Sequence, residues 1–163
     1  MPSIRPMKPD AAAPAQPVSI MERQVGHLLR RAYALARKNT ADALDGLGDI
    51  SPVQASALLT LADGAMTQAA LSRRIDMEPA NTHGLIKRMA AAGLIDARPD
   101  PANRRLVLVA LTDAGSALTP RIEERLGHST EATLAALSPD ESATLLALLR
   151  RLIAGTPGIG PAD

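Results

Sequence analysis

The chain has 163 residues with a formal net charge of +1, and 46% of them are hydrophobic, enough for the core of one domain. It has no cysteine, which excludes disulfides, thiolate nucleophiles and cysteine-based zinc sites. It also has no phenylalanine and no tryptophan, so the core must be aliphatic.

No apolar run reaches the roughly 18 residues of a membrane span. Residues 1–18 lack the apolar centre of a signal peptide, so we expect a disordered N-terminal tail, no membrane contact and a cytoplasmic location.

Two helices are predicted in the first part of the chain. Ser19 and Glu22 have the spacing of a capping box, and apolar residues follow at helical spacing to about Ala43. A second start signal begins at Ser51, which is followed by a proline and, three residues after the cap, by a glutamine. This second helix is expected to stop near Gly64.

The middle of the chain predicts a short helix, a turn and another helix. Thr67 is the expected N-cap of a helix over residues 68–75, and residues 76–78 form the turn. Pro79 suits the first turn of the next helix, which is expected to end at Gly93.

A β-hairpin is predicted next. Residues 94–98 and the β-branched run 106–111 have the length of strands. Residues 99–103 contain two prolines, an aspartate and an asparagine, a composition typical of a turn. Arg104 and Arg105 follow directly, so the hairpin has a basic edge.

Two long helices complete the predicted elements. Thr112 caps the first, which runs towards Leu137 with a kink at Pro120. Ser138 opens a capping box for the last helix, and residues 155–163 form a flexible tail. The apolar face of the last helix is wider than one small core requires, which favours a dimer contact over an ordinary buried helix. Its apolar residues are Leu145, Leu146, Leu148, Leu149, Leu152 and Ile153.

Charge is distributed unevenly along the chain. Residues 66–112 carry seven basic and four acidic side chains, a net charge of +3, whereas residues 113–163 carry four basic and seven acidic ones, a net charge of −3. A basic middle beside an acidic end is the asymmetry expected if the middle faces phosphate.

The order of the elements predicts a fold class that is mainly α with a small β wing, a winged helix-turn-helix. A helix fits the major groove of DNA, and the residues of its N-terminal turns meet the base edges. An arginine at the tip of a hairpin can enter the neighbouring minor groove. This arrangement indicates a protein that binds double-stranded DNA.

The chain resembles the MarR family of bacterial regulators. The resemblance rests on Gly93-Leu94-Ile95, then Asn103-Arg104-Arg105, then Thr112-Asp113-Ala114-Gly115, which is close to the family's wing pattern. Ser51-Pro52-Val53-Gln54 is similar to the start of the family's second helix, and Thr67-Gln68 with residues 71–75 is similar to its third.

This resemblance implies a homodimer on a pseudo-palindromic operator and a role in transcription regulation, most often as a repressor. It implies one domain over residues 19–154, with the winged helix-turn-helix at about 51–112. The dimerisation helices come from both ends, at about 19–46 and 113–154.

The resemblance also implies the residues that contact DNA. Residues 79–88 would form the recognition helix, and the family often has a basic residue where Gly84 stands. The expected DNA contacts are Ser72, Arg73, Arg74, Asn81, Thr82, His83, Lys87, Arg88, Asn103, Arg104 and Arg105.

Many family members bind a small anionic aromatic compound. His27, Arg30 and Arg31 lie beside apolar residues of the first helix and could hold a phenol, an aromatic carboxylate or an aromatic acyl coenzyme A thioester. The alternative is that Arg30 and Arg31 are solvated or paired across the dimer.

No cofactor is expected. No metal site is expected either, because His27, His83 and His128 fall on different helices.

Other functions remain open at this level. A winged-helix regulator without a small-molecule ligand fits the sequence equally well, and the basic wing favours DNA over a module that binds only proteins. We expect no enzyme activity, because the chain has no recognisable nucleophile elbow or phosphate-binding loop.

Overall fold

The structure is a computed structural model that describes residues 20–155. The chain divides into two compact units, one ending at Tyr33 and the other beginning at Ala34. The first unit contains a short 3-10 helix, η1 (Ile20–Arg23), and the first part of α1 (Val25–Leu44). The predicted cap Ser19 lies outside the described residues, and the α-helix expected there begins only at Val25, after the 3-10 turn.

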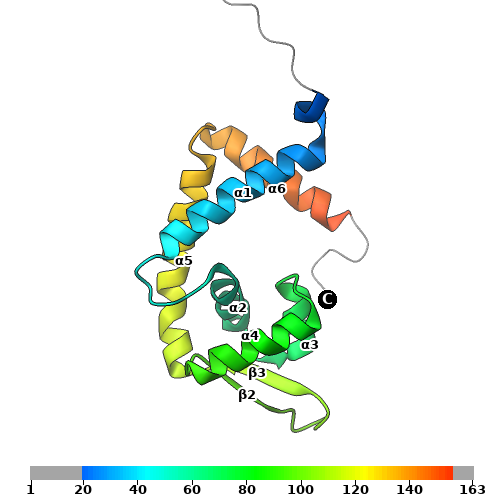
Figure 1. Cartoon of the computed structure of the whole chain (residues 1–163), viewed down its shortest axis with the longest axis vertical. Coiled ribbons are helices and arrows are strands. Elements are labelled where there is room, and N and C mark those ends of the chain that lie inside the picture. Colours follow the sequence, from blue (N-terminus) through cyan, green and yellow to red (C-terminus); the bar gives the residue numbers. More distant parts are fainter. Residues whose placement is uncertain (1–19, 156–163) are drawn as a thin grey trace, which may run out of the picture. The chain divides into compact units, whose positions relative to one another are not determined.

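The second unit contains the end of α1 and the remaining elements (Figure 1). These are α2 (Pro52–Ala62), β1 (Met66–Thr67), α3 (Gln68–Arg74), α4 (Pro79–Ala91), β2 (Ile95–Pro99), β3 (Val107–Leu111), α5 (Asp113–Leu134) and α6 (Pro139–Ala154). The predicted fold class, mainly α with a small β wing, is confirmed.

Side-chain caps set the start of several helices, as predicted. At α6 the backbone N–H of Ser138 donates to Glu141 Oε2 at 2.8 Å, and this bond, with a second from the Ser138 hydroxyl, lowers the pKa of the exposed Glu141 carboxyl. The same reciprocal capping box opens α2 at Ser51. Thr67 and Thr112 cap α3 and α5 by accepting a hydrogen bond from a backbone N–H of the first turn.

Pro120 lies inside α5 without ending the helix. A proline has no N–H for the carbonyl four residues earlier, here that of Ser116. The Thr119 hydroxyl donates to that carbonyl oxygen at 2.8 Å, so the oxygen keeps a partner. The helix ends at Leu134, three residues before the predicted Leu137.

The sheet has one more strand than the sequence predicted. Its order is β1-β3-β2, with both pairs antiparallel, and Val109 of β3 lies opposite Met66 of β1 and Ala97 of β2. Strand β1 is only two residues long, too short to show an alternating pattern, and its second residue is Thr67, the cap of α3.

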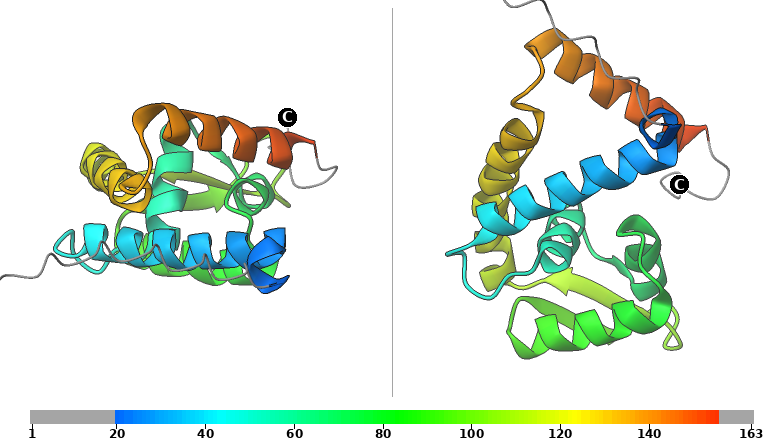
Figure 2. Two further views of the ribbon diagram at one scale, coloured as in Figure 1. Left: turned by 90° about the horizontal axis from the view of Figure 1, so that it is seen from above. Right: turned by 45° about the horizontal axis from the view of Figure 1, so that its top comes forward.

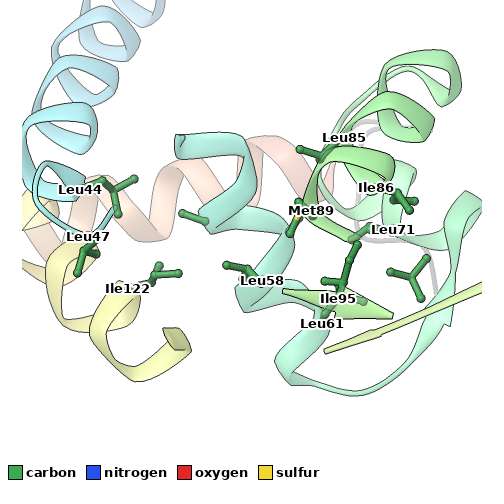
Figure 3. Close-up of a cluster of buried hydrophobic side chains, with 13 residues drawn as sticks. Leu44, Leu47, Leu58, Leu61, Leu71, Leu85, Ile86, Met89, Ile95 and Ile122 are labelled. Carbon is green, nitrogen blue, oxygen red and sulfur yellow. The ribbon is translucent and has the colours of Figure 1, made fainter. Parts of the chain in front are cut away.

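The core of the second unit is aliphatic, as the composition required. Figure 3 shows Leu58 and Leu61 of α2 facing Leu71 of α3 and Met89 of α4. The buried hydrophobic residues are Leu44, Leu47, Ala55, Ala57, Leu58, Leu61, Leu71, Leu85, Ile86, Met89, Ile95, Val109 and Ile122. Helices α2, α3 and α4 and the sheet therefore pack as one body.

A buried polar link joins α3 to α4. The Thr82 hydroxyl of α4 lies 3.1 Å from Ser72 Oγ of α3 and 3.1 Å from the carbonyl oxygen of Glu78. The Ser72 hydroxyl in turn donates to the carbonyl oxygen of Met77, in the turn between the two helices. Both side chains are buried, so they tie the two helices and their turn together away from water.

Hydrogen bonds join the base of the hairpin to the start of α5. The Thr112 hydroxyl donates to the carbonyl oxygen of Gly93 at 2.6 Å, and the Thr112 N–H donates to that of Leu94 at 3.2 Å. Gly115 is buried against the same place, and a Cβ at this position would lie 2.0 Å from the Leu94 carbonyl oxygen.

Gly115→Ala is therefore expected to lower the free energy of unfolding by about 1–3 kcal/mol, because the backbone of Leu94 must move to admit a methyl group. Denaturant titration measures the loss. Gly127→Ala is the control: Gly127 lies inside α5 with open space around it, and alanine there should stabilise by about 0.5–1 kcal/mol. Equal effects of the two substitutions would contradict the close contact.

Thr82→Val keeps the shape of the side chain and removes its hydroxyl, so it is expected to cost about 0.5–1.5 kcal/mol of stability. The salt dependence of DNA binding should not change, because no phosphate contact is lost. A variant of unchanged stability with an altered preference for one base would instead show that Thr82 contacts DNA.

Candidate nucleic-acid interface

Helices α3 and α4 form a helix-turn-helix. The chain reverses over residues 75–78, where the N–H of Met77 donates to the carbonyl oxygen of Ser72 at 3.0 Å. Asp76 has φ +50°, and among the described residues it is the only non-glycine with a positive φ. Aspartate tolerates this left-handed conformation better than most residues, so the turn is made without glycine.

Helix α4 has one buried and one exposed face. Leu85, Ile86 and Met89 face the core. The predicted contact residues Asn81, His83, Lys87 and Arg88 are exposed. The helix begins at Pro79, as predicted, and its N-cap Glu78 makes no side-chain hydrogen bond to the first turn. Its first N–H groups are therefore not capped by that side chain.

Two predicted DNA contacts are wrong. The Thr82 side chain is 0% exposed and that of Ser72 is also buried, and both are engaged in the link between α3 and α4. The sequence placed Thr82 in the first turns of the recognition helix, but it did not show which side of the helix faces the core. Their role is to hold α4 against α3.

The hairpin loop presents two arginines to solvent. The N–H of Asp100 donates to the carbonyl oxygen of Leu106 at 2.9 Å and closes the loop. Asn103 Oδ1 accepts from the N–H of Arg105 at 3.2 Å, so Asp100 and Asn103 shape the turn as expected. Arg104 and Arg105 are both exposed.

Strand β2 contacts α4 and runs back along it, so the closed end of the hairpin lies towards the N-terminal end of α4 (Figure 2). This is also the end at which α3 leads into the helix. The arrangement brings the exposed arginines of α3 and of the hairpin loop to the N-terminal end of α4, whereas the exposed basic residues of α4 itself, Lys87 and Arg88, lie towards its C-terminal end.

The two arginines of α3 differ in their surroundings. Both are exposed, but Arg74 Nη1 lies 3.1 Å from Asp63 Oδ2. A cavity of about 310 Å³ lies beside this pair and includes Arg73 in its lining. An exposed ion pair contributes little free energy, so a phosphate could replace the carboxylate of Asp63 as the partner of Arg74.

His27, Arg30 and Arg31 share one face of α1, because they are three and four residues apart. Arg30 Nη2 lies 3.4 Å from Nδ1 of His27. His27 is half-buried and the two arginines are exposed. His27 and Arg30 are therefore within contact distance of each other, and Arg31 follows on the same helix.

Within residues 20–155, no three histidine, aspartate or glutamate side chains come together in a way that could hold a metal ion. His27, His83 and His128 lie on α1, α4 and α5. In the same part of the chain, none of the helices is both long enough and apolar enough to cross a membrane.

Comparison with known proteins agrees with this geometry. A family model described as MarR family matches residues 48–106, which span α2 to the hairpin loop. The HTH-type transcriptional repressor NicR of Pseudomonas putida is 33% identical over 135 residues, which cover 80% of this chain and 82% of NicR.

Two solved structures extend the comparison. BpsR of Bordetella bronchiseptica, whose DNA binding is regulated by 6-hydroxynicotinic acid, has a TM-score of 0.75 at 33% identity and covers 83% of this chain and 96% of its own. The transcriptional repressor CouR, bound to a 23-mer DNA duplex, has a TM-score of 0.77 at 20% identity, covering 85% of this chain and 98% of its own, a likeness of fold. The chain belongs to the MarR family and is a DNA-binding transcriptional regulator with a winged helix-turn-helix, not an enzyme.

Proposed function

We propose that this protein is a homodimeric repressor that binds a pseudo-palindromic operator and is released from it by a small anionic aromatic acid. The observation that carries the proposal is the helix-turn-helix with exposed basic residues on α4 and on the loop of the wing beside it. Its relative NicR is named as a repressor. Since its target would be chromosomal DNA, the protein would act in the bacterial cytoplasm.

Each part of the interface has a distinct task in this proposal. Helix α4 enters the major groove, where Asn81 and His83 of its first turns face base edges. Lys87, further along the same helix, neutralises a phosphate. Arg104 at the wing tip reaches into the minor groove, where a narrow A·T stretch attracts guanidinium. Arg73, Arg74 and Arg105 hold the flanking phosphates.

The exposed apolar face of helix α6 is the argument for a homodimer. None of its residues is buried within one chain, and Leu148 and Leu152 are 51% and 55% exposed. Leu145 and Leu149 lie on the same face at helical spacing, so the apolar surface is continuous along the helix. A second copy of α6 would cover this surface and place two copies of α4 on successive major grooves.

The effector would bind at His27, Arg30 and Arg31. A guanidinium binds a carboxylate through charge-assisted hydrogen bonds, and the imidazole can bond a ring hydroxyl or ring nitrogen. The 33% identical BpsR is regulated by 6-hydroxynicotinic acid, an aromatic acid of this chemistry. Other aromatic acids and their coenzyme A thioesters carry the same anionic group.

Release would follow from a population shift. Both copies of α4 must stand at one spacing to enter successive grooves, so a ligand that prefers another spacing competes with the operator. It acts only through its differential affinity for the two spacings. A tenfold loss of operator affinity requires about 1.4 kcal/mol of such a difference.

Substitutions of two basic residues should separate the kinds of DNA contact. Arg104→Ala is expected to weaken operator binding by about 1–3 kcal/mol, mainly for sites with an A·T-rich flank. Lys87→Ala should reduce the slope of log affinity against log salt by about one unit. Fluorescence anisotropy at several salt concentrations measures both. An unchanged slope with a changed base preference would make Lys87 a base-reading residue.

Leu148→Glu is expected to break the dimer, because the carboxylate would be buried in an apolar interface. Analytical ultracentrifugation should show a monomer, and operator affinity should fall about 100-fold or more as the second half-site is lost. Ala147→Glu places the same charge on the opposite face of α6 and should remain a dimer. A wild-type protein that is monomeric at micromolar concentration would contradict the dimer itself.

Arg30→Ala and Arg31→Ala should leave operator binding intact and abolish release by the effector, because the anion loses its partner. Anisotropy of an operator complex titrated with 6-hydroxynicotinic acid, benzoic acids and aromatic acyl coenzyme A measures the response. Lys38→Ala removes an exposed cation of α1 that pairs with Asp42 and should respond normally. Variants that respond like the wild type would disprove this site. If no compound releases the DNA, a regulator without a small-molecule ligand replaces the proposal.

A further inference from the structure

We infer that Arg88 reads a guanine in the operator and that Gly84 gives its guanidinium the position from which it does so. The inference rests on the proposed function, in which α4 is the helix that enters the major groove. It assigns the specificity of the operator to a residue in the third turn of that helix.

The position of the guanidinium follows from the geometry of α4. Gly84 and Arg88 are four residues apart, so they lie on the same face, about 6 Å apart along the axis. Side chains of a helix lean towards its N-terminus. Accordingly, a Cβ built on Gly84 would lie 3.4 Å from Nη1 of Arg88. The guanidinium thus rests over Gly84, one turn nearer the end of the helix that meets base edges.

Arg88 is also free to bind. It is exposed, and within residues 20–155 the ion pairs are Lys38 with Asp42 and Arg74 with Asp63, so no carboxylate engages it. A guanidinium presents parallel N–H donors that match O6 and N7 of guanine, whereas the neighbouring Lys87 is a point charge without this geometry.

The fold does not require glycine at position 84. The residue lies inside a helix with an ordinary negative φ, and Nη1 of Arg88 is the one atom near enough to meet a Cβ. Glycine is unfavourable in the interior of a helix. A Cβ here would touch the guanidinium only at van der Waals distance, whereas a longer side chain such as leucine would compete for the space in which the guanidinium lies.

The first arm of the test is selection of duplexes from a random library by the wild-type dimer, followed by base substitution at each position of the selected site. We expect guanine at one symmetric position of each half-site. Arg88→Lys keeps the charge, so the salt slope should stay the same while the preference for that guanine falls about tenfold or more. Retention of the full preference by Arg88→Lys would overturn base reading by Arg88.

The second arm tests Gly84 with Gly84→Leu, Arg88→Ala and the double variant. If leucine acts by displacing the guanidinium, the double variant should bind no more weakly than Arg88→Ala alone. Effects that add would show that leucine collides with DNA directly and would overturn the role of Gly84.

The two proposals fail in different ways. A wild-type protein that enriches no duplex sequence overturns the proposed function and this inference together. A wild-type protein that enriches a palindrome, with a guanine preference that is insensitive to Arg88, leaves the proposed function in place and overturns only the inference.

Discussion

The winged helix depends on the place where four elements meet. Helix α4 ends at Ala91, β2 begins at Ile95, β3 ends at Leu111 and α5 begins at Asp113. Hydrogen bonds from Thr112 to the carbonyls of Gly93 and Leu94, with Gly115 buried against them, hold these four ends together. Because both ends of the hairpin are held at this point, the position of the wing beside α4 is set by backbone contacts and not by its exposed tip.

These contacts explain why the wing pattern of the sequence predicts the fold so well. The two ends of the wing pattern, at residues 93–95 and 112–115, are the segments that touch, and a side chain at Gly115 would collide with the Leu94 carbonyl. The arginines between them are not needed for this contact and lie exposed in the loop. The wing pattern therefore combines two kinds of residue. Packing requires those at its two ends, and the exposed arginines between them are available for DNA.

The second constraint is the orientation of α4. Its apolar residues Leu85, Ile86 and Met89 enter an aliphatic core, and the buried Thr82 hydroxyl links it to α3. These contacts determine which residues remain outside, namely Asn81, His83, Lys87 and Arg88. Helix α6 has no comparable contacts within the chain, since none of its residues is buried, and its exposed apolar face is the basis of the proposed dimer.

The sequence by itself determined the helices with strong caps, the hairpin and the aliphatic core, because these depend on local hydrogen bonds, turn residues and side-chain type. It placed Arg104 and Arg105 directly after a turn at residues 99–103, whereas in the structure Pro99 still belongs to β2 and both arginines lie exposed inside the loop before β3. Only the tertiary structure decided that Thr82 and Ser72 face inwards, that Met66 and Thr67 pair with β3, and that Arg74 meets Asp63. Those features join residues that are distant in the sequence or depend on the rotation of a helix about its axis, and a local pattern carries no information on either.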